Sequence, residues 1–343
     1  MSSFDYEDEE LEDDIEEADE KEEKKPSLFR RIFRFIEKLL GFATSLCTIL
    51  FIVYTVIVLR YIHEVETVED GERIEHDTVL MQSKDVTNIL LIGADTRSAE
   101  ERGRADTVIL LSINSDRETI TMVSFMRDSY VEIPGRGMGK LNASYRYGGA
   151  ELLMDTLEVN FKFEIDDYVY INFESFSDIV DAVGGIELTV SDAEAQGMRA
   201  PMAEVNDIAG RPSNTDFLPG GGTYLMNGNQ ALAYARLRYV GNADFERTQR
   251  QREVIRKIFE KAKTLSIGDL DKFLKTCAQS VVTNMAKKDM YLLSLKMIRY
   301  VGYDLEELRI PCDDCYRGAT IGGQSVLELD FDANVKAIGE ALY

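Results

Sequence analysis

One uncharged apolar segment, Leu39–Leu59, constrains this chain more than any other feature of its sequence. As a helix, its 21 residues would span about 31 Å, close to the ~30 Å hydrocarbon core of a bilayer. A helix buried in a soluble domain rarely remains apolar on every face over such a length. No small-residue cleavage site follows Leu59, so we expect an uncleaved membrane anchor and not a removed signal peptide.

The charges on the two sides of this segment predict its orientation. After it comes Arg60, followed mostly by acids. Before it lie six basic residues: Lys24, Lys25, Arg30, Arg31, Arg34 and Lys38. Lysine and arginine beside a membrane span stay in the cytosol. We therefore expect a single-pass cell-membrane protein with a cytoplasmic N-terminus and an extracellular C-terminal domain.

The acidic composition excludes some functions. The net charge is −23, and residues 1–23 alone carry 14 acids and one lysine, which predicts a solvated cytoplasmic arm. The rest of the chain is still net acidic, which argues against nucleic acid as a partner. The only two histidines, His63 and His76, leave little room for histidine-based catalysis.

The chain divides by composition, with no repeat of 20–50 residues evident. We expect a cytoplasmic tail over 1–38, the membrane helix over 39–59, a polar stalk over 60–85 and a folded domain over 86–343.

Short apolar runs alternate with helical patterns beyond residue 86. This alternation predicts a single layered α/β domain, with a central mixed sheet flanked by helices and preceded by the transmembrane helix. Gly- and Pro-rich residues 196–222 predict a long exposed loop. The predicted strands are Val86–Gly93, Thr107–Ile113, Thr119–Met126, Tyr168–Asn172 and Ile186–Val190. The predicted helices are Gly149–Asn160, Phe173–Val183, Asn227–Ala235, Phe245–Leu265 with Asp244 as its N-cap, Leu270–Asn284 and Tyr291–Tyr300.

Asp and Arg residues gather where the predicted strands end. Because ligands of α/β sheets bind at strand ends, this clustering suggests a site, although each Asp could simply cap a turn and pair with an Arg. These residues are Asp95 and Arg97, Arg104 and Asp106, and Arg127 and Asp128.

The segment Tyr234–Arg252 carries five arginines in an otherwise acidic domain. Arg236 and Arg238, two residues apart, would point the same way on an extended backbone. Arg247, Arg250 and Gln251 share one face of a helix. Guanidinium groups fit phosphate oxygens in pairs, so the cluster predicts a phosphate or pyrophosphate site. The alternative is a solvated helix face paired with Glu246 and Glu253.

At these residues the chain resembles the LytR-CpsA-Psr family over about residues 86–265. Two departures are visible: Met126 stands where the family usually has Pro, and Ala105 where it often has Ser. Nine motifs carry the resemblance, in this order: N-I-L-L-I-G-A-D-T-R at 88–97, R-A-D-T at 104–107, S-F-M-R-D at 124–128, K-L-N-A-S-Y at 140–145, G-G at 148–149, D-D-Y-V-Y-I-N-F at 166–173, F-S-D-I-V-D-A-V-G-G at 176–185, N-G-N-Q-A-L-A-Y-A-R-L-R at 227–238 and D-F-E-R-T-Q-R-Q at 244–251.

The resemblance implies an enzyme of cell-wall biogenesis. Family members resemble phosphotransferases that move a glycopolymer, such as a teichoic acid or capsular polysaccharide, from a polyprenyl-pyrophosphate carrier to a peptidoglycan hydroxyl. An apolar cleft is expected to hold the polyprenyl tail. Two alternatives remain open: a non-catalytic polyprenyl-pyrophosphate sensor or scaffold of the cell envelope, and a pyrophosphate hydrolase.

The chemistry of phosphoryl transfer assigns roles to the charged residues. Such catalysis is mostly positioning and charge neutralisation, which we assign to a pyrophosphate clamp of Arg97, Arg127, Arg236, Arg238, Arg247, Arg250 and Gln251. A general base is needed, and the candidates are Asp106, Asp128 and Asp244. The resemblance to the family implies that Asp95 and Asp106 hold Mg²⁺ or another divalent cation. Both could instead pair with Arg97 and Arg104.

The cysteines are weighed separately. Cys312 and Cys315 form a CxxC pair in the part expected outside the cell, which favours a local disulfide. Cys277 could pair with either of them. A zinc site lacks partners, because both histidines are distant in the sequence. Cys47 lies in the apolar segment.

Overall fold

A computed structural model describes residues 28–69, 71–94, 103–238 and 244–343. The chain separates into two units, residues 1–57 and 58–343, which we describe individually. Helix α2 (Leu28–Glu64) contains a segment, Ile36–Glu64, that is long and apolar enough to cross a membrane. This finding is consistent with the predicted anchor.

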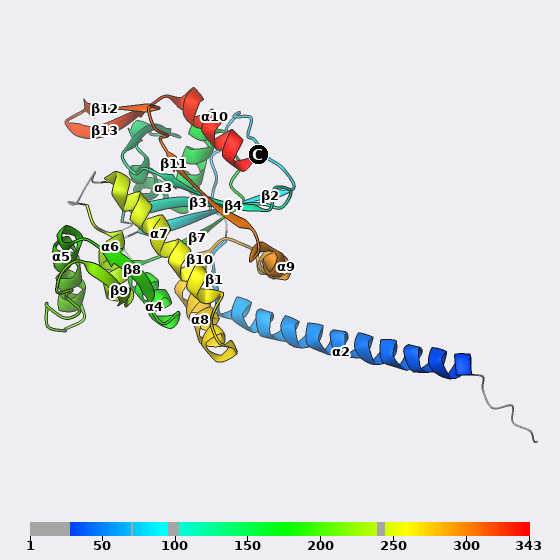
Figure 1. The fold of residues 1–343 in the computed structure, drawn as a ribbon. Helices are drawn as coiled ribbons and strands as arrows, with labels where there is room; N and C mark the ends of the chain where they lie inside the picture. Colours follow the sequence, from blue (N-terminus) through cyan, green and yellow to red (C-terminus); the bar gives the residue numbers. More distant parts are fainter. Residues whose placement is uncertain (1–27, 70, 95–102, 239–243) are drawn as a thin grey trace, which may run out of the picture. The chain divides into compact units, whose positions relative to one another are not determined.

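The unit 58–343 is built on a seven-stranded mixed sheet (Figure 1). Its order is β1-β10-β7-β2-β3-β4-β11, with β2, β3 and β4 antiparallel and with β7 parallel to β2. The strands are β1 (Glu66–Thr67), β2 (Val86–Ala94), β3 (Ala105–Asn114), β4 (Thr119–Phe125), β7 (Asp167–Ile171), β10 (Val282–Thr283) and β11 (Asp304–Ile310).

Two smaller sheets accompany it. One has the order β12-β13-β5-β6 and the other pairs β8 with β9. Their strands are β5 (Ser129–Ile133), β6 (Gly137–Lys140), β8 (Ile186–Val190), β9 (Gly222–Met226), β12 (Tyr316–Ile321) and β13 (Gln324–Leu329).

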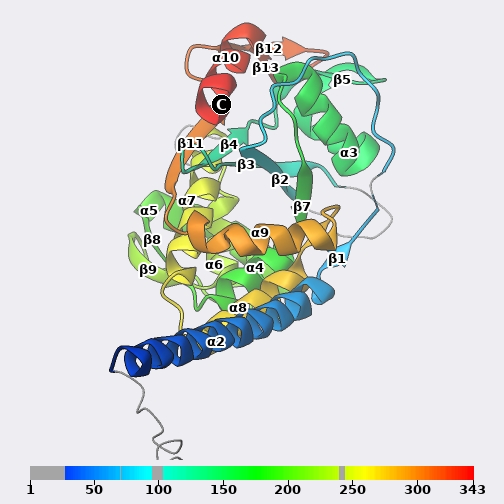
Figure 2. The same ribbon diagram turned by 90° about the vertical axis from the view of Figure 1, so that its right-hand side faces the viewer.

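Helices cover both faces of the central sheet, as the strongly apolar strands require (Figure 2). Helices α3 (Leu141–Phe161) and α10 (Phe331–Leu342) pack on one face around a core that includes Leu90, Leu110 and Phe161. A second core joins α4 (Phe173–Ala182), α5 (Asp192–Ile208), α6 (Gly228–Ala235) and α7 (Asp244–Ala262). Helices α8 (Ile267–Ser280) and α9 (Lys287–Tyr300) follow. The predicted fold class is confirmed.

One local prediction was wrong, and another was incomplete. Residues 196–208, expected in a loop, belong to α5, because Ser191 and Glu194 form a capping box that starts the helix and Met198 and Met202 anchor it in the second core. Helix α3 consists of two helical segments that meet at Gly149, where the backbone is not helical (φ 76°, ψ −158°), so the predicted helix Gly149–Asn160 corresponds to the second segment and the first, from Leu141, was missed.

Residues of the expected stalk lie against α3. The guanidinium of Arg73 pairs with the carboxylates of Asp155 and Glu158, and the main-chain N–H of Ile74 donates to Asp155 Oδ2 (2.9 Å). The part of the expected stalk around Arg73 and Ile74 therefore belongs to the folded unit.

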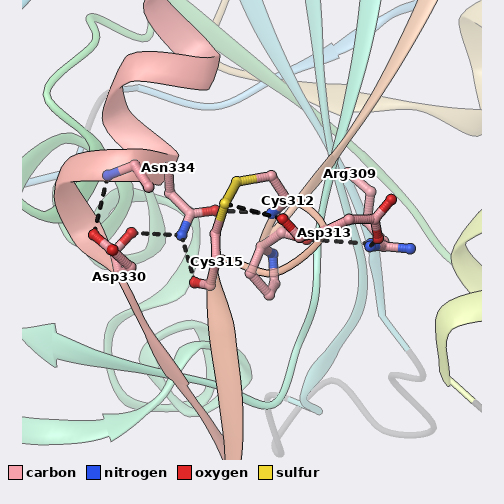
Figure 3. Close-up of a disulfide and its surroundings, with 8 residues drawn as sticks. Arg309, Cys312, Asp313, Cys315, Asp330 and Asn334 are labelled. Atoms are coloured by element: carbon pink, nitrogen blue, oxygen red, sulfur yellow. Dashed lines mark hydrogen bonds and ion pairs between the residues drawn. A yellow bond between two sulfur atoms is a disulfide. The ribbon is translucent and has the colours of Figure 1, made fainter.

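Cys312 and Cys315 form the predicted local disulfide (Figure 3). The side-chain oxygen of Asn334 accepts from the Cys312 N–H (2.9 Å), and its amide donates to the Cys315 carbonyl (3.0 Å). Cys277 is a free thiol, and burial raises its pKa to about 12. The loop that leads into β12 is thus fixed to α10.

Candidate functional site: an arginine cluster between two hollows

Asp106 lies at the centre of the charged cluster. Strand β3 carries it, and its side chain is only 20% exposed. Its two carboxylate oxygens accept from Arg127 Nη1 (2.8 Å) and Arg238 Nη2 (2.8 Å). Arg247 Nη2 lies 3.6 Å from Asp106 Oδ1 and also donates to the Asp106 carbonyl. Residues far apart in the chain therefore converge on one carboxylate.

The arginines dominate the electrostatics of Asp106. Burial alone would raise the pKa of this carboxyl, but Arg247, Arg238 and Arg127 hold it below its ordinary value. Burial also lowers the pKa of Arg247 to about 10, so this guanidinium remains charged at neutral pH.

A second set of charges extends the cluster. Arg127 Nη2 contacts Asp244 Oδ2 (3.3 Å), and Lys140 Nζ contacts Asp128 Oδ1 (2.7 Å). Burial would raise the pKa of Asp128, but Lys140 and Arg127 lower it. Together with Asp106, Arg238 and Arg247, these groups amount to four cations against three carboxylates, an arrangement that favours an anion.

An apolar pocket of about 220 Å³ ends at this cluster. It lies between strand β2 and the layer of α4, α6 and α7, and Asp106, Arg236, Arg238 and Arg247 line its polar end. Its apolar lining includes Leu91, Ile171, Phe173, Phe176, Ile179, Leu232, Ile255, Ile258 and Phe259.

A polar groove of about 860 Å³ meets the cluster from the other side. Asp106 and Arg238 line both hollows. The groove is lined further by Arg104, Arg127, Asp128, Tyr130, Arg136, Lys140, Asn142, Tyr147, Ile321 and Gln324. A molecule with a polar part, a central anion and an apolar tail would fit the three regions in that order.

The predicted clamp residues are only partly assembled. Arg127, Arg238 and Arg247 gather on Asp106, and Gln251 lines the apolar pocket. Arg250 turns elsewhere: its guanidinium pairs with Glu194 (3.0 Å) and Glu246 (2.7 Å). Asp95 and Arg97 lie outside the described residues.

Two details differ from the sequence expectations. Arg236 caps the C-terminus of α6 with helical backbone angles, so the extended backbone expected there was wrong. Its guanidinium instead pairs with Glu204 (3.0 Å) and lies over the ring of Phe173 (4.6 Å). Asp244 is the first residue of α7, where it accepts from Arg127 and Arg247.

Some site residues escaped sequence reasoning. Lys140 stands in one of the quoted motifs but had no assigned role. The aromatic residues Phe173, Phe176 and Phe259 line the apolar pocket but also had no assigned role, since no periodicity distinguishes a pocket wall from a core face.

The metal expectation fits the donor chemistry of the site only in part. Among the described residues, no group of three or more His, Cys, Asp or Glu side chains is placed to hold a metal ion. Mg²⁺ commonly takes one or two carboxylates together with substrate phosphates, and Asp106 supplies one such carboxylate. Asp106 pairs with Arg127, Arg238 and Arg247 and not with Arg104, so the salt-bridge alternative involves different arginines.

Arginines around a partly buried carboxylate, at the junction of an apolar pocket and a polar groove, are the arrangement expected of proteins that bind amphipathic phosphorylated lipids. The chain belongs to the LytR_cpsA_psr family, whose model matches residues 54–339. The match extends beyond the segment 86–265 that carried the resemblance.

Curated relatives and solved structures agree with this family. The chain is 35% identical over 235 residues to the polyisoprenyl-teichoic acid–peptidoglycan teichoic acid transferase TagU of Enterococcus faecalis, covering 67% of this chain and 72% of the relative. It is 33% identical over 237 residues to TagT of Bacillus subtilis, covering 65% and 70% of the two chains.

Two structures of TagT show the same fold. One, bound to LI-WTA, has a TM-score of 0.61 at 26% identity and covers 81% of this chain and 97% of that chain. Another, with bound octaprenyl pyrophosphate lipid, has a TM-score of 0.57 at 25% identity and the same coverage.

Proposed function

We propose that this protein is a membrane-anchored phosphotransferase that moves a teichoic acid-type glycopolymer from a polyprenyl-pyrophosphate carrier to peptidoglycan. The observation that carries the proposal is the convergence of Arg127, Arg238 and Arg247 on Asp106 at the polar end of an apolar pocket. The names of the relatives support the same reaction, and a capsular polysaccharide is the second candidate polymer.

The two hollows suggest how the donor is bound. The polyprenyl tail would occupy the pocket lined by α4, α6 and α7, where burial of its methyl and methylene groups drives binding. The pyrophosphate would lie beside Asp106 and Arg238, which line both hollows, and the glycan would enter the polar groove.

The reaction then requires one bond to form and one to break. An acceptor hydroxyl oxygen attacks the glycan-bearing phosphorus, and the bond from that phosphorus to the bridging oxygen breaks, releasing polyprenyl phosphate. The guanidinium groups of Arg127, Arg238 and Arg247 neutralise the pyrophosphate, which would otherwise repel the nucleophile.

A general base must remove the proton of the acceptor hydroxyl. Three carboxylates are candidates for this role: Asp106, Asp128 and Asp244. The pKa values of Asp106 and Asp128 are lowered by their cationic neighbours, and a carboxylate with a lowered pKa is a weak base at neutral pH. We therefore assign Asp106 mainly to orienting the arginines. The same reason counts against Asp128, so Asp244 is the preferred candidate for the base.

Mg²⁺ or another divalent cation completes the proposal. Asp106 would hold it, together with Asp95 from outside the described residues. Bound there, the ion would withdraw negative charge from the pyrophosphate oxygens.

The topology of the reaction supports an extracellular catalytic unit. Basic residues before the apolar span and the Cys312–Cys315 disulfide both fit a domain outside the cytosol. Peptidoglycan, the proposed acceptor, lies on that side of the membrane.

The test uses the full chain in detergent, a lipid-pyrophosphate-linked saccharide and peptidoglycan fragments. We expect a phosphodiester product from the native protein and at least about a 100-fold loss of turnover for Arg238→Ala, because removing a charge-stabilising donor costs about that much. Arg236→Ala should lose transfer as well. The matched control is Arg317→Ala, whose guanidinium is exposed and pairs with Glu328 on the surface.

Two results would overturn the proposal in different ways. Tight binding of the donor without a phosphodiester product would favour the sensor. Release of free glycan phosphate with abundant acceptor present would favour the hydrolase.

A further inference from the structure

The point where the chain leaves the predicted membrane span is fixed to helix α8. Residues Val58–Glu64 belong to the same compact unit as the site. The Tyr61 hydroxyl donates to the Asp271 carboxylate, and the Gln279 amide donates to Glu64 Oε2 (3.0 Å). Glu64 follows Leu59 by five residues, about 8 Å of helix, so α8 must lie close to the membrane surface.

The adjoining corner exposes apolar side chains beside lysines. We call residues 259–275, from the end of α7 into α8, the α7–α8 corner. Ile267 is 90% exposed at the start of α8, and Leu274 and Phe259 are also exposed. The corner carries four lysines, Lys261, Lys263, Lys272 and Lys275, against three acids, Glu260, Asp269 and Asp271.

This combination is unusual for a surface that faces only water. Asp269 accepts from Ser266 at the start of α8, Asp271 accepts from Tyr61, and Glu260 pairs with Arg256 (2.7 Å), so local contacts occupy all three acids. Exposed apolar residues flanked by lysine are typical of segments that lie in the head-group region of an anionic bilayer. In a domain that is otherwise acidic, the net positive charge of the corner matches that surface.

The corner also adjoins the apolar pocket. Phe259 lines the pocket and is partly exposed at the corner. Along α7, the pocket residues run from Arg247 through Gln251 and Ile255 to Phe259, a path of about 18 Å. Figure 1 shows α7 leading directly into α8. One end of the pocket therefore meets the arginines and the other meets the corner.

We propose that the α7–α8 corner docks on an anionic lipid bilayer. Ile267 and Leu274 enter the boundary between head groups and acyl chains, and Lys261, Lys272 and Lys275 contact lipid phosphates. A polyprenyl tail then passes from the bilayer into the pocket at Phe259 without crossing water, a consequence that rests on the proposed function.

The chain contains no tryptophan, so one introduced tryptophan reports on its own surroundings. We would reconstitute the full-length Ile267→Trp protein into nanodiscs of anionic lipids with brominated or unbrominated acyl chains. The matched control is Ile208→Trp, at the end of α5, where the native isoleucine is 73% exposed.

Insertion to the acyl boundary should quench the emission of the Ile267→Trp protein roughly twofold in brominated discs and leave the Ile208→Trp protein unchanged. Equal emission of the Ile267→Trp protein in both kinds of disc would overturn docking on the bilayer. This is also the result expected if the natural occupant of the corner is another protein. Because quenching needs no turnover, failure of the proposed reaction would leave this test intact.

A second comparison tests the lipid charge. Lys272→Glu with Lys275→Glu, added to Ile267→Trp, should weaken the quenching in anionic discs. Quenching unaffected by this charge reversal would contradict the role of anionic lipid.

Discussion

At the scale of single residues, the site depends on Asp106 as an organiser of arginines. Arg127, Arg238 and Arg247 carry like charges and would repel one another without a carboxylate among them. The Arg247 side chain is only 5% exposed, and a buried cation is tolerated when it is paired and hydrogen-bonded. Asp106 thus holds in place the charges that a bound pyrophosphate would use.

We predict that Asp106→Asn lowers kcat by about 100-fold or more, because an amide cannot hold three guanidinium groups in position for the transition state. The measurement is steady-state transfer from a lipid-pyrophosphate-linked saccharide. Glu340→Gln provides the control, since Glu340 is exposed and pairs only loosely with Lys336 (3.8 Å). Near-native turnover of Asp106→Asn would mean that the arginines keep their positions without the carboxylate.

At the scale of elements, the pocket depends on the close approach of α4 and α6. Gly228 begins α6, and its N–H donates to Asp181 Oδ1 at the end of α4 (2.7 Å). A Cβ atom at Gly228 would come within 2.2 Å of the Ser177 carbonyl oxygen. The two helices supply Phe173 and Arg236 to the pocket, so their spacing sets its width.

Gly228→Ala should therefore destabilise the protein by about 1–3 kcal/mol, the usual cost of overpacking, and weaken binding of a polyprenyl pyrophosphate. Thermal unfolding and a lipid-binding titration in detergent measure the two effects. In the control Gly268→Ala, no atom lies within 4 Å of the new Cβ, so stability should stay constant or rise slightly. Equal stability of the two variants would show that α4 and α6 can separate without cost.

The elements also show where sequence reasoning succeeds. Strands β2, β3 and β4 and helices α4, α6 and α7 were predicted because their apolar residues follow one clear period or form one bounded run. Strands β5 and β6 were missed, since Gly137–Lys140 is short and contains two glycines. Helix α5 was missed because Gly197 and Pro201 suggest a loop, while tertiary packing of Met198 and Met202 outweighs these signals.

At the scale of the whole molecule, the site joins segments that no local pattern connects. Arg238 and Asp106 are separated by 132 positions, and Arg127 and Asp244 by 117. The sequence placed Asp106 and Arg127 near strand ends, Arg238 in an arginine-rich segment and Asp244 at the start of a helix. It could not show that Arg250 turns toward Glu194 while Arg247 turns toward Asp106, because both lie on one helix and only the surrounding carboxylates distinguish them.

The ion pairs of Asp106 make the free energy of unfolding depend on pH, and they stabilise the protein less in acid. The folded-state pKa of Asp106 lies below its ordinary value of 3.8, so the carboxylate contributes stability above about that pH and loses it as the pH falls through the folded value. Asp128 and Glu194 also have lowered pKa values, whereas burial raises the pKa of Asp166, so the total profile combines opposing contributions.

A difference measurement isolates Asp106. We predict that the gap in unfolding free energy between the native protein and Asp106→Asn is nearly constant from pH 7 to about pH 5 and narrows below about pH 4, as the native carboxyl becomes protonated. Denaturant unfolding at several pH values measures it, and carboxylates common to both proteins largely cancel. A gap that stays constant through the acid range would show that the arginines do not lower the pKa of Asp106. The charge cluster would then have to be held together by Asp128 and Asp244 alone.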